Sequence, residues 1–143
     1  MATCCFFGHR DCPETIRPVL WGTLIGLIEK YGVTRFLVGH QGAFDAISLS
    51  VLRELEKTYP KIQYDIVLAH MPKERSEYAP ETAQHTFLPE GIETVPRRFA
   101  VDRCNNWMLQ NSDFVVTYVR YATGGAAKFA SEAKRLGKVV VEI

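Results

Sequence analysis

Glycine, histidine and arginine recur where short apolar segments of the chain end. One such segment ends in Gly8-His9-Arg10-Asp11, a second leads into the run from Gly39 to Asp45, and a later one leads into the run from Arg120 to Ala126. Glycine lets the backbone turn tightly, and the start of a following helix offers free N–H groups and a positive dipole end. Arginine adds a fixed fork of donors. Together these residues favour binding of a phosphate or another anion.

The elements that must position these residues are alternating strands and helices. The sequence predicts strands at 3–7, 35–39, 62–69, 114–119 and 138–143, and helices at 15–31, 43–58, 98–111 and 125–136. The strands are almost continuously apolar, which is typical of strands buried on both faces. Helical connections between them imply right-handed crossovers. We therefore predict an α/β fold with a mainly parallel sheet of about five or more strands, covered on both faces.

Ligands of an open parallel sheet bind at the carboxyl ends of its strands. Gly39 and Gly42 precede the second predicted helix, and Gly124-Gly125 precedes the last one. Neither segment matches the phosphate loop of P-loop proteins or the GxGxxG dinucleotide fingerprint. Arg103 and Asn106 lie three residues apart and share a helix face, which we expect either to reach a ligand's phosphate or ribose or to be solvated.

The length of 143 residues suits one domain, 1–143. Residues 71–98 hold four prolines and little periodicity, so we interpret them as an irregular insertion or a lid. Within it, 82–87 could form a helical turn and 92–95 a short strand. Its apolar side chains Tyr78, Phe87 and Leu88 could cover the site or contact a partner.

Composition narrows the classes of partner. The net charge is +1, and Arg97, Arg98 and Arg103 form a cluster rather than a basic stripe, so nucleic acid is a disfavoured partner. No apolar run approaches the roughly 20 residues that span a bilayer, and no secretion signal is recognisable. We therefore expect a cytoplasmic protein with no membrane contact.

Cysteine and histidine permit two other kinds of site. The four cysteines lack CxxC spacing, and we expect reduced, mostly buried thiols, with a redox or nucleophilic role for Cys12 or Cys104 as the alternative. Three histidines follow predicted strands and could meet an acid at a metal site; they are His9, His40 and His70, with Asp11 or Asp45. No HxH or HxxxH pair is present, so we predict no metal.

The order and spacing of these motifs resemble those of the YpsA-like (DUF1273) proteins. The resemblance rests on GHR at 8–10, GxxGxxD at 39–45, R-x-N-x-W-M-x-x-x-S-D at 103–113 and GGA at 124–126, and it spans nearly the whole chain. Such proteins belong to the SLOG superfamily, with the LOG-type proteins and the DNA-processing protein DprA. The resemblance implies a Rossmann-like three-layer αβα sandwich that binds a nucleotide or nucleotide-derived ligand at the glycine-rich strand ends.

The candidate ligand-binding positions come from the residue pattern and the resemblance together. They are Gly8, His9, Arg10, Gly39, Gln41, Gly42, Asp45, Arg103, Asn106, Thr123, Gly124, Gly125, Ala126 and Lys128. We assign no cofactor; as a ligand, a nucleotide, NAD or an ADP-ribose-like molecule would suit the site. Because related proteins often associate, we also expect a homo-oligomer, although no residue identifies its interface.

One departure from the LOG pattern bears on catalysis. The LOG enzymes carry PGGxGTxxE, and aligning the double glycine places Thr123, Ala127, Lys128 and Ser131 on the proline, third glycine, threonine and glutamate. Glu132 lies one residue after the position of the motif's glutamate, which places its side chain about 100° further around a helix. This counts against a LOG-like glycosidase. Lys128 could instead add positive charge near a phosphate.

Three functional hypotheses follow. The leading one is binding or sensing of a nucleotide-like small molecule. The second is a nucleotide hydrolase of N-glycosidase type, with Asp45 or Glu132 as the acid and Arg10 or Arg103 on the phosphate. The third is a DprA-like nucleic-acid-associated protein, which the near-neutral charge disfavours. Whether the chain is an enzyme stays open.

Overall fold

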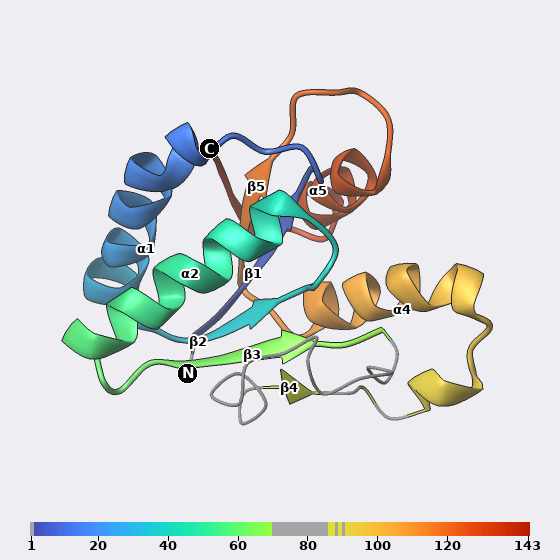
Figure 1. Cartoon of the computed structure of the whole chain (residues 1–143), viewed down its shortest axis with the longest axis horizontal. Coiled ribbons are helices and arrows are strands. Elements are labelled where there is room, and N and C mark those ends of the chain that lie inside the picture. Colours follow the sequence, from blue (N-terminus) through green and yellow to red (C-terminus); the bar gives the residue numbers. More distant parts are fainter. Residues whose placement is uncertain (1, 70–85, 88, 90) are drawn as a thin grey trace.

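The sheet is the centre of the fold. The computed structural model describes residues 2–69, 86–87, 89 and 91–143. Within them, six strands pair in the order β4-β3-β2-β1-β5-β6, and every neighbouring pair is parallel (Figure 1). The strands are β1 (Ala2–Gly8), β2 (Val33–Val38), β3 (Gln63–Val67), β4 (Thr86–Phe87), β5 (Phe114–Tyr118) and β6 (Val139–Glu142). The predicted parallel α/β sheet is thus confirmed.

In the described part of the chain, four α-helices cover the two faces of this sheet. They are α1 (Arg17–Tyr31), α2 (Ala43–Thr58), α4 (Arg97–Gln110) and α5 (Gly125–Arg135). Apolar residues of α1 and α2 form one core cluster with Cys4 and Phe6, whereas those of α4 and α5 form another with Cys5 and Phe7. Alternate side chains of β1 therefore point to opposite faces, as the period of a strand requires. The three-layer αβα sandwich follows from this division.

The strand order reverses direction at β1. From β1 the chain moves outward through β2 and β3, and later it returns to the other side of β1 as β5 and β6. Loops that leave β1 and β5 therefore lead to opposite faces of the sheet, which opens a crevice at the carboxyl ends of these two strands. The fold thus predicts a binding position between the loops after β1 and β5.

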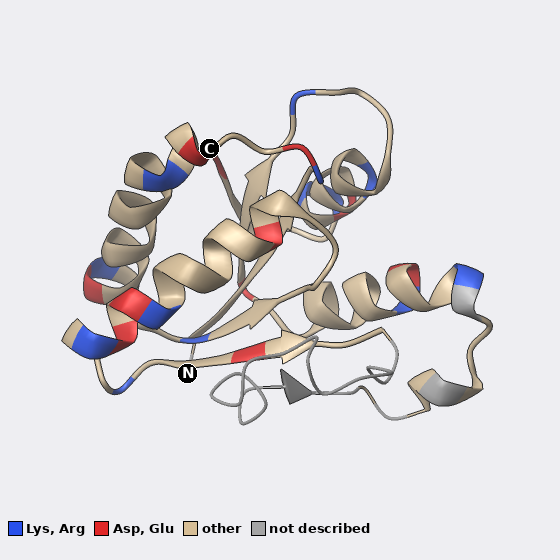
Figure 2. Cartoon of the chain, in the orientation of Figure 1, with Lys and Arg blue, Asp and Glu red and all other residues tan. Residues whose placement is uncertain are grey.

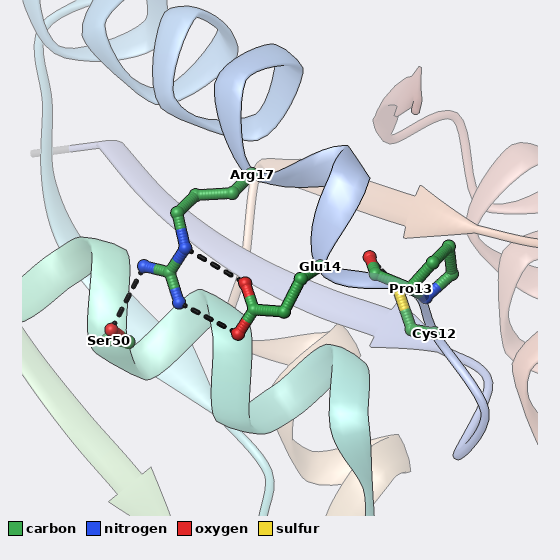
Figure 3. A network of polar contacts seen from close by, with 5 residues as sticks. All are labelled: Cys12, Pro13, Glu14, Arg17 and Ser50. Atoms are coloured by element: carbon green, nitrogen blue, oxygen red, sulfur yellow. Dashed lines mark hydrogen bonds and ion pairs between the residues drawn. The ribbon is translucent and has the colours of Figure 1, made fainter.

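A 3₁₀ turn, η1 (Glu14–Ile16), precedes α1 and is fixed by a charged network (Figure 3). Arg17 Nε and Nη2 donate to the Glu14 carboxylate at 3.0 and 3.1 Å, and Arg17 Nη1 donates to Ser50 Oγ at 3.0 Å. Because Ser50 lies on α2, this network joins the start of α1 to its neighbouring helix.

Two local predictions differ from the structure. Ile92–Thr94 is a 3₁₀ turn (η3), not a strand. Gly91, with φ of 80°, starts the turn, and its carbonyl accepts hydrogen bonds from both the N–H and the hydroxyl of Thr94. Thr86–Phe87 is not part of a helical turn but strand β4, paired with β3. The rest of 82–87, and Tyr78, Leu88 and the side chain of Phe87, lie outside the described residues, so the lid prediction does too.

Charged residues are spread over the helices. Figure 2 shows basic and acidic segments interspersed along α1, α2, α4 and α5 in the view drawn. Among the described residues, no helix combines the length and apolarity needed to cross a membrane.

Candidate functional site

A cavity of about 310 Å³ lies at the carboxyl end of β1, where the strand order reverses. This volume is at the lower end of the usual range for small-molecule sites. Its walls come from β1 and from the loops or helices that follow β1, β2 and β5, with α4 closing one side. The lining residues are Phe6, Phe7, Gly8, His9, Arg10, Gln41, Asp45, Val101, Asn105, Gly125 and Ala126. Seven of the predicted positions are therefore brought together.

Three glycines serve close packing within the site. A Cβ on Gly8 would lie 2.2 Å from the buried ring of Phe44, and a Cβ on Gly42 would lie 2.6 Å from Cα of Arg10. A Cβ on Gly39 would lie 3.0 Å from Oδ2 of Asp45. Gly39 and Gly42 do not line the cavity. Gly42 lets the loop after β2 pack directly against the loop after β1, and Gly39 leaves room for the side chain of Asp45.

The start of α2 is closed by groups of the chain itself. The N–H of Ala43 donates to the carbonyl of Arg10 at 2.9 Å, and the N–H of Gln41 donates to Oδ2 of Asp45 at 2.9 Å. Asp45 is the third residue of α2, where a carboxylate can reach back and cap the helix. At the first glycine junction, the carboxylate of Asp45 therefore occupies the place at the helix start that an anionic ligand could otherwise take.

The carboxyl group of Asp45 lies partly buried at the cavity wall. Burial raises the pKa of Asp45 from 3.8 to about 6, and the hydrogen bond from the Gln41 N–H opposes this shift. A pKa near 6 leaves a useful protonated fraction close to neutral pH, which is the condition for a general acid.

The start of α5 is arranged differently. Gly124, with φ of 102°, precedes the helix and offers no side-chain cap. The N–H groups of Gly125 and Ala126 have no hydrogen-bond acceptor among the described residues, and both residues line the cavity. The first N–H groups of a helix have no partner within the helix itself. The second glycine junction is therefore open toward the cavity.

His9 connects the loop after β1 to the loop after β5. Its Nε2 accepts from the backbone N–H of Arg120 at 2.7 Å and of Tyr121 at 3.3 Å. The proton of the neutral imidazole therefore sits on Nδ1. The ring also lies 4.6 Å from the ring of Tyr121, whose hydroxyl donates to Asp11 at 3.0 Å. His9 is buried and positions the open junction of α5.

Arg10 is the exposed cation of the cavity wall. Its carbonyl caps α2, but its guanidinium has no hydrogen-bond or ion-pair partner among the side chains and backbone groups that the structure describes. A guanidinium in that state can bind a phosphate or carboxylate through two parallel hydrogen bonds.

The remaining predicted positions lie elsewhere. Arg103, Asn106, Lys128 and Glu132 line a second cavity of about 500 Å³ between α4 and α5. There Lys128 Nζ pairs with Asp102 at 2.8 Å, and Glu132 pairs with Arg135, which lowers the pKa of Glu132. Thr123 and Gly124 are exposed and line neither cavity. The two candidate acids, Asp45 and Glu132, therefore face different cavities.

Asn105 is a cavity residue that the sequence prediction did not select. It lies one turn after Val101, and both residues face the first cavity. The helical angles place Asn105 between Met108 and Leu109, which are fully buried. A polar amide inside the apolar stripe of a helix was the signal that marked it.

The alternative metal and thiol chemistry finds no support in the described residues. They contain no group of three or more His, Cys, Asp or Glu side chains that could hold a metal ion, and His70 lies outside them. All four cysteines are free. Burial raises the pKa of Cys104 to about 12 and also raises that of Cys12, so both thiols stay protonated near neutral pH.

No protein-family model matches this chain, and no curated protein matches it either. The family resemblance stays a prediction that rests on the motifs themselves.

Proposed function

We propose that the chain binds a nucleotide or a nucleotide-derived small molecule in the first cavity. The observation that carries this proposal is the place of the cavity. It lies where the strand order reverses between β1 and β5, which is the usual binding position of open α/β sheets. The family resemblance, with its SLOG-type expectation of a nucleotide ligand, agrees with this proposal.

The phosphate would lie between Arg10 and the start of α5. Arg10 offers a guanidinium without a partner among the described residues, and Gly125 and Ala126 offer N–H groups at the positive end of a helix dipole. The start of α2 cannot serve in the same way, because Asp45 and the Arg10 carbonyl already occupy it.

The rest of the ligand would lie against the mixed wall of the cavity. Phe6, Phe7 and Val101 supply apolar surface, while Gln41 and Asn105 supply amide groups. Small-molecule sites commonly combine apolar walls with a few polar groups that fix orientation. A sugar or base next to the phosphate suits this division.

A thermal-shift screen tests the proposal. The panel is AMP, ADP, NAD, ADP-ribose, ribose 5-phosphate and inorganic phosphate. A ligand that binds only the folded chain raises the melting temperature as its concentration rises. Calorimetry then measures the affinity of the best ligand.

The matched variants are Arg10→Ala and Arg103→Ala. Arg10→Ala should weaken binding about tenfold or more, because a charged hydrogen-bond pair is lost. Arg103→Ala removes an equal charge from the second cavity and should leave affinity unchanged. If no member of the panel binds, or if both variants bind equally well, the proposal is wrong.

A second candidate function is hydrolysis of the bound nucleotide, with Asp45 as the general acid. The raised pKa of Asp45 at the cavity wall favours it. Chromatography of the best-binding nucleotide after incubation should then reveal a free base or ribose phosphate. Asp45→Asn should abolish this release and retain binding; release that survives the substitution would exclude Asp45 as the acid.

A further inference from the structure

Strand β6 forms one outer edge of the sheet. In the part of the chain that the structure describes, no strand pairs with its outer side, and Figure 1 shows the C-terminal end on the side of the fold away from β4. The N–H groups of Val139 and Ile143 donate inward, to the carbonyls of Asp113 at 3.1 Å and Thr117 at 2.8 Å. Hydrogen-bonding directions alternate along a strand. The N–H and C=O groups of 140 and 142 therefore point outward.

Apolar side chains accompany this open edge. Val139 is 52% exposed, and it is the register partner of Phe114 in β5. Tyr31, which is 62% exposed, lies with its ring 5.6 Å from that of Phe114. Val139, Phe114 and Tyr31 therefore form an apolar patch next to the edge. Unprotected edges of this kind are templates for pairing with another strand.

We propose that β6 is the interface with a second copy of this chain. The two β6 strands would pair antiparallel about a two-fold axis at Val140, which extends the sheet across both copies. Val140 then faces Val140 of the second copy and exchanges both backbone hydrogen bonds with it. Val139 faces Val141, at a position where opposite side chains approach closely.

The charges at the ends of the strand select this register. With the axis at Val140, Lys138 lies opposite Glu142 of the second copy, and the pair occurs twice. If the axis moved by one residue toward Lys138, the same outward backbone groups would still pair. Lys138 would then lie opposite Val140 and not opposite an acid. The N–H of Lys138 already donates to Ala133 at 3.0 Å, so Lys138 contributes its carbonyl, which accepts from the N–H of Glu142.

The same charges act on the isolated chain. Glu142 pairs with Lys134 at 2.7 Å on the exposed surface. In the pair of chains, Glu142 lies between Lys134 of its own chain and Lys138 of the second copy. Charged residues at a sheet edge discourage pairing with arbitrary strands, whereas these two complement each other only in the antiparallel register. Because β6 has four residues, the association should be weak and concentration-dependent.

Sedimentation velocity of the full chain at rising concentration tests this proposal. The mass should move from 16.2 kDa toward twice that value. Lys138→Glu places two acids opposite each other and should weaken association about tenfold. Adding Glu142→Lys to the same chain exchanges the charges and should restore part of the association, because it also ends the ion pair between Glu142 and Lys134. Lys61→Glu, an exposed change of equal charge between α2 and β3, is the control.

Each possible result of this experiment either supports or overturns the proposal. Circular dichroism first verifies that each variant has the wild-type fold. A chain that stays at 16.2 kDa at every concentration overturns the proposal. So does association that ignores Lys138→Glu, or that the double exchange fails to restore even in part. Val139→Lys gives an independent check, because it places a charge in the contact with Val141 and should abolish association.

Discussion

The two glycine junctions of this chain have similar sequences and opposite states. After β2, Gly42 lets the loop contact Arg10, Gly39 leaves room for the carboxylate of Asp45, and that carboxylate accepts from the N–H of Gln41. After β5, Gly124 and Gly125 leave the start of α5 uncapped and facing a cavity. Glycine at a strand–helix junction therefore does not by itself mark a ligand site. Whether the start of the helix is open to a ligand depends on which groups of the chain already occupy it.

The largest difference between the two junctions should appear when an alanine replaces one glycine in each. Gly42→Ala places Cβ 2.6 Å from the backbone of Arg10 and should lower the free energy of unfolding by about 3 kcal/mol. Gly125→Ala meets no atom within 4 Å and should be neutral or stabilising by about 0.5 kcal/mol. Urea denaturation measures both. Equal losses would mean that both junctions are packed alike.

The closed junction also predicts a pH dependence. The folded pKa of Asp45, about 6, exceeds its ordinary value of 3.8, so the folded chain binds this proton more tightly than the unfolded chain. This contribution to stability is present below pH 3.8 and is lost as the pH rises through 6.

Asp45→Asn should remove that dependence. At neutral pH the free energy of unfolding should rise by about 2 kcal/mol. Removing the buried charge relieves about 3 kcal/mol, and part of this gain is lost because the neutral side chain interacts less with the helix dipole. Urea midpoints across this pH range measure the difference. A variant with the same pH profile as the wild type would contradict the assignment.

The open junction should depend on His9. His9→Phe removes the acceptor for the N–H groups of Arg120 and Tyr121 and should cost about 1 kcal/mol, because water can replace it at this exposed loop. Hydrogen exchange at both amides should accelerate about tenfold. The amide of Ile143, bonded to Thr117, is the internal control and should not change.

The smallest effect should come from Tyr121→Phe. This change removes the exposed hydrogen bond to Asp11, which is also the main cause of the raised pKa of Tyr121. Because this pair is exposed to solvent, the loss of stability should be too small to lower the melting temperature measurably. A larger loss in thermal denaturation would show that Asp11, and not only His9, holds the loop after β5.

Sequence periodicity was sufficient for five of the six strands and for the four helices of the described residues, because buried parallel strands and amphipathic helices have distinct patterns. It failed at Thr86–Phe87, which pairs with β3 as strand β4, and at Ile92–Thr94, where the left-handed Gly91 decides the turn. The spacing of Arg103 and Asn106 drew attention to their shared helix face, whereas Asn105 lies within the apolar stripe of α4 and lines the first cavity. The packing of Cys104 and Met108 turns this stripe toward the sheet.

The bond between His9 and the N–H of Arg120 joins residues that are 111 positions apart. Contacts of such long range form slowly, because much chain must be ordered before they do. During synthesis, β1 leaves the ribosome early but must wait for β5 before its second neighbour and the far wall of the cavity exist. A nascent chain that stops before β5 would expose the apolar flank of β1, which makes this interval the one most open to aggregation.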